Sequence, residues 1–343
     1  MRTMTLRDSR VLNESHRPYI VAELNTSHSG NMETAKEMII RAKEVGCDCV
    51  KFQSWSAESL YSKTFYDENP IANRIFKKFS FSEKELAELA EFCQKNEIAF
   101  SSTPYSRIEV DFLVNRCRAP FVKVASMDLN NYMYLDYIAR TGVPIVLSTG
   151  MGEVEEIHRA IETIEKAQNK NICLLHCISI YPAAASSIRL KNILGLSHEF
   201  PNYPIGFSDH SIGTEIATAA IALGAVLIEK HFTLDRKKIG IDNQIASEPE
   251  EMAQLVRHCH NVHAALGDTN RIVSPEELVQ RKKMRRSIIA AKDLKAGTKL
   301  TAGDLDVKRP GTGLPPEKIN ELIGRTLLRD IEGDRLISPE DIS

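Results

Sequence analysis

The stretch Ile205-Gly206-Phe207-Ser208-Asp209-His210-Ser211 decides the fold that we expect, together with Leu227-Ile228-Glu229-Lys230-His231-Phe232. Each is a short apolar run that ends abruptly in polar and ionisable residues. In a parallel α/β protein, such a junction marks the carboxyl end of a buried strand, where ligands bind. Two junctions that each deliver a histidine predict that His210 and His231 meet at one site and bind a divalent metal.

The same pattern is repeated along residues 18–267, where short apolar runs alternate with amphipathic segments. Strands that are apolar on both faces are typical of a parallel sheet covered by helices. Eight strand–helix units favour an α/β fold of the closed (β/α)8 TIM-barrel type, and no Gly-rich fingerprint of an open Rossmann sheet follows the first strand. We expect the eight strands at residues 19–24, 49–52, 98–102, 121–125, 144–148, 172–176, 203–207 and 226–228.

The remaining segments do not show this alternation of short apolar runs and amphipathic stretches. Residues 1–17 are polar, and we expect an irregular arm there. Residues 54–80 show no clear period and are expected to form a long loop of the kind that is often functional. Residues 268–284 form a charged linker, whose basic run is either a solvated connector or part of an anion site. Residues 285–343 consist of short pieces, which predict a small second domain that docks on the barrel or on a second subunit.

Composition excludes several classes of protein. The chain has 343 residues, 43% of them hydrophobic, and a net charge of -2, which gives no general attraction to nucleic acid or to acidic membranes. It has no apolar run long enough to span a membrane, and residues 1–6 lack the apolar core of a signal peptide. The seven scattered cysteines do not form a disulfide framework. We therefore expect a cytoplasmic protein.

Polar residues near the carboxyl ends of the predicted strands should converge on one mouth of the barrel. They include lysines and several serines, which suits an anionic, phosphorylated substrate. Lysine neutralises phosphate, while hydroxyls and backbone N–H groups bind its remaining oxygens. The residues that we expect at this mouth are Glu23, Asn25, His28, Lys51, Gln53, Ser101, Ser102, Thr103, Lys123, Ser126, Asp128, Ser148, Thr149, Gly150, His176, Ser179, Tyr181, Ser208, Asp209, His210, Glu229, Lys230 and His231.

The two histidines indicate an exchangeable metal site but do not identify the metal. Two imidazoles with the other positions left open make an exchangeable site that is suited to Lewis-acid chemistry. Imidazole and oxygen ligands alone are compatible with Mn²⁺, Fe²⁺, Co²⁺ or Zn²⁺.

Nine ordered motifs resemble the sialic acid synthase family, which comprises phosphoenolpyruvate-dependent nonulosonic acid synthases such as N-acetylneuraminate, legionaminate and pseudaminate synthases. The resemblance covers nearly the whole chain. The motifs are Ala22-Glu23-Leu24 with His28 and Gly30, Val50-Lys51-Phe52-Gln53, Ser102-Thr103-Pro104, Val122-Lys123-Val124-Ala125-Ser126, Leu147-Ser148-Thr149-Gly150-Met151, His176-Cys177 with Tyr181-Pro182, Gly206-Phe207-Ser208-Asp209-His210, Glu229-Lys230-His231-Phe232-Thr233 and Val307-Lys308-Arg309-Pro310-Gly311.

This resemblance implies a barrel followed by a SAF (antifreeze-like) domain. It also implies a domain-swapped homodimer in which each SAF domain caps the barrel of its partner. The implied reaction joins phosphoenolpyruvate to the open aldehyde of a six-carbon N-acyl amino sugar. Carbon 3 of phosphoenolpyruvate attacks the aldehyde, water adds at carbon 2, and phosphate leaves by C–O cleavage.

The resemblance also implies a role for each site residue. Glu23 would act on the proton of the water, and His210 and His231 would bind the metal, which is usually Mn²⁺ or Mg²⁺ in this family. The residues implied for phosphoenolpyruvate are Lys51, Lys123, Ser148, Ser179 and Ser208. Those implied for the sugar are Gln53, Asp128, Tyr181, Asp242 and, from the other subunit, Arg309.

The chain departs from the family pattern near the expected sugar pocket. Asn25, Ser27, Asp128 and Ile178 stand where the family usually has Gly, Asn, Glu and Thr. The stretch 240–249 also lacks the common Pro after its Gly. The reaction class is therefore indicated more firmly than the sugar.

Two other functions stay open at this point. One is a phosphoenolpyruvate–aldose synthase of the 3-deoxy-octulosonate type, which would need a further cluster of Arg or Lys in the barrel. The other is a non-catalytic sugar-binding relative, which would be expected to lack Glu23, a site lysine or a site histidine, and all of these are present.

Overall fold

The computed structural model describes residues 2–238 and 240–343 of the chain. The chain divides into two compact units, one reaching to Gly267 and one running from Asp268 to Ser343. Each unit has a hydrophobic core of its own. Among the described residues, no helix combines the length and the apolar character needed to cross a membrane.

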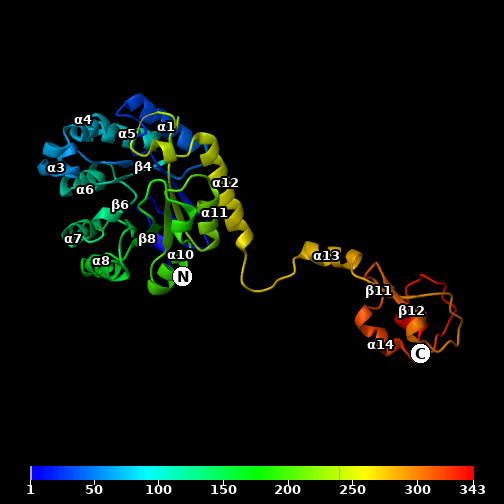
Figure 1. Ribbon diagram of the computed structural model, residues 1–343. Helices are drawn as coiled ribbons and strands as arrows, with labels where there is room; N and C mark the ends of the chain where they lie inside the picture. The colour runs from blue at the N-terminus through cyan, green and yellow to red at the C-terminus, as the bar shows by residue number, and fades with distance from the viewer. Residues whose placement is uncertain (1, 239) are drawn as a thin grey trace. The chain divides into compact units, whose positions relative to one another are not determined.

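The first unit is built on one sheet of eight parallel strands, which confirms the predicted barrel (Figure 1). The strands are β3 (Tyr19–Glu23), β4 (Cys49–Gln53), β5 (Ala99–Thr103), β6 (Val122–Val124), β7 (Ile145–Ser148), β8 (Ile172–Cys177), β9 (Ile205–Asp209) and β10 (Leu227–His231). Strand β10 returns to pair with β3, so β5 and β6 are the two ends of the sheet. Between these ends, the hydroxyl of Ser101 donates to the carbonyl oxygen of Phe121 at 2.9 Å.

An outer layer of helices covers the strands (Figure 1). It consists of α1 (Met32–Glu44), α5 (Glu83–Lys95), α6 (Arg107–Asp111) with its π-helical continuation η1 (Phe112–Arg116), α7 (Tyr132–Arg140), α8 (Val154–Lys166), α9 (Ala185–Ile188), α10 (Asn192–Glu199), α11 (Glu215–Ala222) and α12 (Pro249–Leu266).

Helix α1 shows how the local sequence sets these bounds. The side chain of Asn31 accepts a hydrogen bond from the N–H of Thr34 at 2.8 Å and so caps the first turn. At the other end, Gly46 has a φ of 91°, a conformation that ends the helix at little steric cost. Between them, Met38 and Ile39 are fully buried on the face toward the sheet.

Alternate residues of each strand face two different cores. In β3, Val21 packs inside the barrel, while Ala22 packs in the core between sheet and helices. Because strand side chains alternate with a period of two, Glu23 faces inward again. The same alternation in β10 turns Leu227 and Glu229 inward. The interior is therefore apolar near the beginning of the strands and polar near their carboxyl ends.

The arm expected at residues 1–17 contains a short hairpin of β1 (Met4–Thr5) and β2 (Val11–Leu12). Met4 and Leu12 are buried and pack with Tyr19 and Leu227 in the inner core. The hairpin therefore closes the amino-terminal end of the barrel. A pattern of so few apolar residues in a polar segment carries no period from which two-residue strands can be predicted.

The long loop expected at residues 54–80 was a wrong prediction, because the segment is mostly helical. It forms α2 (Ala57–Leu60), α3 (Lys63–Glu68) and α4 (Pro70–Phe79). Ser56 and Ser62 cap the first two helices, and Pro70 starts the third. Helices α2 and α3 are too short to show an amphipathic period. Helix α4 does repeat apolar residues at Ile71, Ile75 and Phe79, a signal that the prediction missed. Aromatic rings of the segment pack on one another, with Tyr61 stacked on Phe65 at 4.2 Å between ring centroids.

The second unit contains α13 (Pro275–Met284), within the predicted linker, and then a small irregular domain. The domain is organised around the antiparallel pair β11 (Ser287–Ala290) and β12 (Leu305–Lys308), with the short helix α14 (Ile319–Leu322). Its core is formed by Ile288, Ala290, Leu294, Leu300, Leu305, Leu322, Leu327, Ile331 and Ile337.

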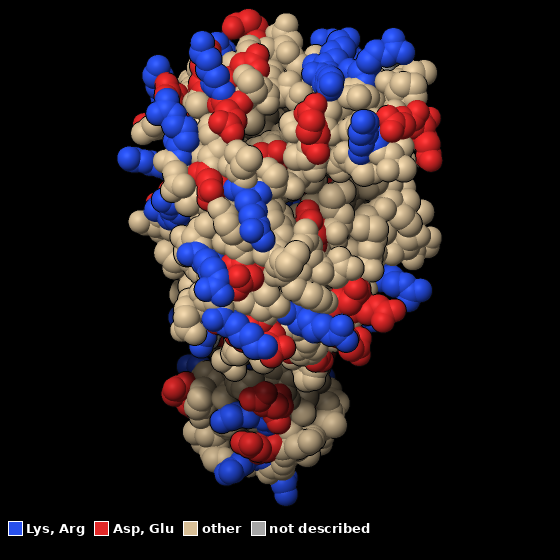
Figure 2. All heavy atoms as spheres, turned by 90° about the vertical axis from the view of Figure 1, so that its left-hand side faces the viewer, with Lys and Arg blue, Asp and Glu red and all other residues tan. Residues whose placement is uncertain are grey.

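Charged side chains of both signs are interspersed on the face seen in Figure 2. That face shows no broad surface of one sign. This mixture agrees with the net charge of -2 and gives no support for binding to nucleic acid.

Gly206 in β9 has no room for a side chain, which gives a test of the barrel. A Cβ there would lie 2.8 Å from the backbone oxygen of Leu227 and 2.5 Å from Cδ2 of Leu175. Since neighbouring strand backbone cannot move away cheaply, Gly206→Ala should lower the free energy of unfolding by about 1–3 kcal/mol. Urea denaturation followed by the fluorescence of Trp55, the single tryptophan, measures this change.

Gly195→Ala in α10 is the matched control. A Cβ there meets nothing within 4 Å, and alanine favours a helix by about 0.5–1 kcal/mol over glycine. We expect this variant to be as stable as the parent or more stable. Equal losses of stability in the two variants would contradict the strand packing described here.

Candidate active site

The polar interior residues meet in a cavity of about 450 Å³ at the carboxyl ends of the strands. Because inward positions recur every second residue, each strand contributes one or two side chains to it. The structure brings together Glu23, Lys51, Gln53, Lys123, Ser148, Ser179, Tyr181, Ser208, His210, His231 and Asp242, all of them expected from the sequence.

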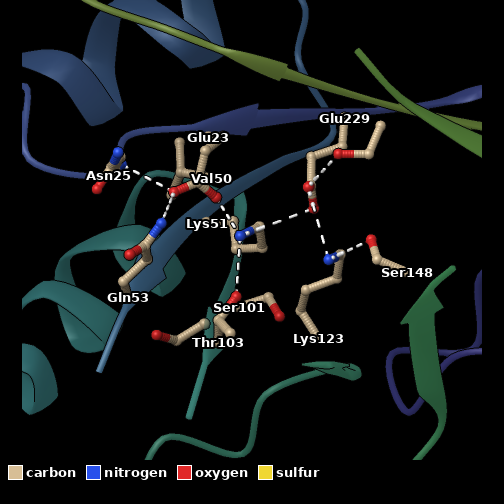
Figure 3. Close-up of polar contacts among 12 residues, drawn as sticks. Glu23, Asn25, Val50, Lys51, Gln53, Ser101, Thr103, Lys123, Ser148 and Glu229 are labelled. Carbon is tan, nitrogen blue, oxygen red and sulfur yellow. Dashed lines mark hydrogen bonds and ion pairs between the residues drawn. The ribbon is translucent and has the colours of Figure 1, made fainter. Parts of the chain in front are cut away.

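Two lysines and two glutamates form a buried network at the base of this cavity (Figure 3). Lys51 forms an ion pair with Glu23 and lies 3.7 Å from Oε2 of Glu229. Lys123 lies 3.8 Å from Oε1 of the same Glu229. All four side chains are at least nine-tenths buried. Burial of isolated charges is costly, so the opposite charges stabilise one another here.

Hydroxyl groups orient the ends of this network. Lys51 donates to the hydroxyl of Thr103 at 3.0 Å, and Lys123 donates to that of Ser148 at 2.7 Å. The hydroxyl of Ser208 donates to Glu229 at 2.9 Å. The ammonium groups are thus held in fixed positions next to open space, as a site for an anion requires.

The network shifts the pKa values of Glu23 and Glu229 in opposite directions. Burial raises the pKa of Glu23, and the charge of Glu229 adds to this rise although Lys51 opposes it. Burial also acts to raise the pKa of Glu229, but Lys123 and Lys51 outweigh it and lower that pKa. Two carboxyl groups with opposite shifts favour different roles, a proton carrier and a permanent anion.

The imidazoles of His210 and His231 lie beside each other, with 5.4 Å between their ring centroids. Nδ1 of His210 donates to the carbonyl oxygen of Ile178 at 2.8 Å, which leaves Nε2 as the free nitrogen. Burial, with the positive groups around it, lowers the pKa of His231 well below its usual value and keeps it neutral. Burial also acts to lower the pKa of His210, but its contacts with Cys177 and with the carbonyl oxygen of Ile178 outweigh burial and raise that pKa. His231 therefore has the neutral form in which histidine binds metals, and His210 has the carbonyl-fixed ring nitrogen that typically orients such a ligand.

The donor set fits a metal held by two protein ligands. Among residues 2–238 and 240–343, no group of three His, Cys, Asp or Glu is arranged to hold an ion. A metal ion held by the two histidines alone would have its other coordination positions open to water or substrate.

One wall of the cavity comes from the unexpected helices of residues 54–80. Trp55, Leu60, Tyr61 and Phe76 line it, next to the polar group of Gln53. The indole N–H of Trp55 donates to Oε1 of Gln53 at 3.0 Å. The cavity thus has an apolar side and a fixed amide, a combination suited to a sugar that carries an acyl group.

Two residues predicted to contact the sugar are not among the described residues that line the cavity. Asp128, at the end of η2 (Ser126–Asp128), is not among the described residues that line the cavity, and it accepts a hydrogen bond from Asn131 at 3.1 Å. Its neighbour Ser126 lines the cavity instead. Arg309 is exposed in the second unit, directly after β12.

Two histidines near strand ends, His28 and His176, are held by packing and hydrogen bonds outside the cavity. His28 is stacked on Phe81 with 4.2 Å between ring centroids, and burial lowers its pKa to about 4. His176 has its Nε2 2.6 Å from the carbonyl oxygen of Ile188. Neither of them lines the cavity.

The sequence prediction placed Glu229, Thr103 and Ser126 at the mouth of the barrel but gave them no chemical role. Glu229 is the most important, since it contacts both lysines. Its place two residues before His231 turns both side chains inward. Thr103, Tyr105, Ser126 and Cys177 also line the cavity.

Comparison with known proteins gives two family matches. The NeuB family matches residues 38–271, and the SAF domain matches residues 285–343. The chain is 34% identical to the N,N'-diacetyllegionaminic acid synthase of Legionella pneumophila, over 94% of each chain. It is also 34% identical to the N-acetylneuraminate-9-phosphate synthase of Mus musculus, over 99% of this chain and 96% of the other.

The fold is similar to a crystal structure of N-acetylneuraminic acid (sialic acid) synthetase from Leptospira borgpetersenii in complex with citrate. The TM-score is 0.75 and the identity 32%, over 81% of this chain and 95% of that chain. These matches confirm the family predicted from the nine motifs. The chain belongs to the NeuB family and carries a SAF domain after its barrel.

Proposed function

We propose that this chain is a nonulosonic acid synthase, which condenses phosphoenolpyruvate with the open-chain aldehyde of an N-acyl hexosamine and releases phosphate. The observation that carries the proposal is the pair of buried lysines, Lys51 and Lys123, in one cavity with two adjacent imidazoles. The named synthases among its relatives support the same reaction class.

Phosphoenolpyruvate has a phosphate and a carboxylate, and the cavity offers two ammonium groups for them. Lys51 and Lys123 would bind these anionic groups, with Ser148, Ser179 and Ser208 as further hydrogen-bond partners. Support comes from the bond of Lys123 to Ser148, which already fixes the direction of the ammonium group. Binding then uses charge-assisted hydrogen bonds in a site that excludes most water.

Glu23 is the residue that we assign to the proton of the attacking water. Carbon 3 of phosphoenolpyruvate forms the new bond to the aldehyde carbon, whose C=O π bond breaks and whose oxygen takes a proton to become a hydroxyl, and this leaves a cationic centre at carbon 2. Water adds there and gives up a proton, and the resulting intermediate expels phosphate by C–O cleavage. The raised pKa of Glu23 supports this role, because its carboxylate is then a better proton acceptor than an ordinary glutamate.

His210 and His231 would hold a divalent metal ion. When bound, the ion supplies Lewis-acid polarisation of the aldehyde and holds it in place. Of Mn²⁺ and Mg²⁺, the donor set favours Mn²⁺, because Mg²⁺ takes oxygen ligands and imidazole nitrogen suits later metals better.

The sugar would lie between Gln53, Tyr181 and Asp242 at the outer part of the cavity. Gln53 is held by Trp55 and also accepts a hydrogen bond from the hydroxyl of Tyr105 at 3.2 Å. Asp128 stays a further candidate, acting through Ser126 or water rather than from the cavity wall.

Charge supports an unphosphorylated sugar. Among the described residues that line the cavity, the lysines are Lys51 and Lys123, and the one arginine proposed for the sugar, Arg309, would come from the second unit of the partner subunit. Glu23, Glu229 and Asp242 lie around them, so a second phosphate group would meet negative charge. This argues against the 3-deoxy-octulosonate type of reaction, which needs a further basic cluster.

The reaction is proposed to take place in the cytoplasm. All seven cysteines are free thiols in the part of the chain that the structure describes, which agrees with a reducing compartment.

Phosphate release provides the test of this function. We expect release only when phosphoenolpyruvate, an N-acyl hexosamine and Mn²⁺ are all present, and we expect a chelator to stop it. A 6-phosphorylated sugar should react at least about tenfold more slowly than its unphosphorylated parent, because of like-charge repulsion. A panel of N-acetylmannosamine, its 6-phosphate and di-N-acetylated 6-deoxy sugars measures both points. No release with any sugar would overturn the proposal.

Lys123→Met tests the anion site. Loss of one charge-assisted contact should raise KM for phosphoenolpyruvate and lower kcat/KM by about 10- to 100-fold. Lys43→Met on α1 is the matched control, since Lys43 bonds to the carbonyl oxygen of Glu97 at the surface. It should leave activity unchanged. Steady-state kinetics on both variants measures KM for phosphoenolpyruvate. An unchanged KM in Lys123→Met would contradict the proposed anion site.

We also propose a homodimer in which Arg309 of the second unit serves the sugar site of the partner. Arg309→Ala and His231→Ala should each lose most activity. After subunit exchange, their mixture should regain part of it, because one barrel then keeps an intact histidine and receives an intact arginine. Mass spectrometry confirms the exchange. Confirmed heterodimers without regained activity would contradict the swapped arrangement.

A further inference from the structure

Asp209 and Lys230 form an ion pair on the side of β9 and β10 that faces away from the cavity. Nζ of Lys230 lies 2.6 Å from Oδ2 of Asp209, and the exposed fractions of the two side chains are 1% and 0%. The two residues are directly opposite each other in the strand register. By alternation, each lies beside an inward-facing histidine, His210 in one strand and His231 in the other.

The contacts of this pair fix the residues on both sides of His210 in the sequence. Nζ of Lys230 also donates to the carbonyl oxygen of Ser211 at 2.5 Å. Oδ1 of Asp209 accepts from the N–H and the hydroxyl of Ser211, at 2.9 and 2.7 Å. The residues before and after His210 are therefore both held by the residue that precedes His231.

His210 needs such a support more than His231 does. Strand β9 ends at Asp209, so His210 lies beyond the last paired residue of its strand. His231 is still in β10 and is paired with Glu23 of β3. The Asp209–Lys230 pair ties the segment that carries His210 back to the strand that carries His231.

Stability alone does not account for a charged pair at this position. The outer core around it is apolar, with Phe207 and Ile228 on the same strand faces. Replacing a buried ion pair by uncharged residues of similar volume is often neutral or stabilising, because both charges lose their hydration on folding. A function in fixing geometry explains why the pair is present.

We propose that the Asp209–Lys230 pair is a positioning element, which sets the spacing of His210 and His231 so that both imidazoles bind one metal ion. This inference rests on the proposed function of the site. Both residues would act through the backbone, and neither of them lines the cavity.

Titration of the metal-free full chain with Mn²⁺, followed by calorimetry, tests the inference. Lys230→Met should weaken Mn²⁺ binding at least tenfold. The double variant Asp209→Asn with Lys230→Met has no unpaired buried charge, so its unfolding midpoint should return toward that of the parent. Its Mn²⁺ affinity should stay as low as that of the single variant. This separation of stability from affinity is what a purely structural pair would not produce.

Asp48→Asn is the matched control. Asp48 is a buried carboxylate at the beginning of β4, paired with Arg17 at 2.6 Å and far along the strand from the cavity end. Its loss should lower stability but leave Mn²⁺ affinity unchanged.

Two results overturn the inference, and they differ from each other. Wild-type Mn²⁺ affinity in Lys230→Met, or recovery of both stability and affinity in the double variant, makes the pair structural and leaves the proposed metal site intact. Absence of Mn²⁺ binding in the parent chain removes the metal site itself and the inference with it.

Discussion

The buried charge network of Lys51, Lys123, Glu23 and Glu229 is the constraint on which the rest of the structure depends. Each of these groups would be costly to bury alone, and together they compensate one another. The network requires four strands to end at the same level, which the barrel provides. Below it the interior is filled by apolar side chains and closed by the amino-terminal hairpin. Above it lies the cavity, so an anionic substrate can take over contacts that the carboxylates now make.

Much of this arrangement could be predicted from the sequence, because short apolar runs that end in polar residues locate the strands and the mouth of the barrel. Alternation within β10 then places Glu229 and His231 on the inner face. Helices α2 and α3 could not be predicted, because each is too short for a period and their rings pack mainly on one another. Helix α4 has apolar residues at helical spacing and could have been found. Asp128 was placed by its distance from a strand end, but η2 turns its neighbour Ser126 toward the cavity instead.

The two faces of β9 and β10 contribute to the site in different ways. The inner face carries Ser208, Glu229 and the two histidines, which would meet the substrates. The outer face carries the Asp209–Lys230 pair, which links the backbone segments of β9 and β10 on the side away from the cavity. A site that brings two substrates and a metal together depends on such fixed spacing, since proximity and orientation supply much of the rate enhancement.

The fate of oxygen from water tests the central claim most directly. We would run the reaction with phosphoenolpyruvate, an unphosphorylated N-acyl hexosamine and Mn²⁺ in ¹⁸O-labelled water, and analyse both products by mass spectrometry. The account predicts a new nonulosonic acid and released phosphate that carries no ¹⁸O, because water attacks carbon 2 and the C–O bond breaks. Labelled phosphate, or phosphate release without a new C–C bond, would contradict it.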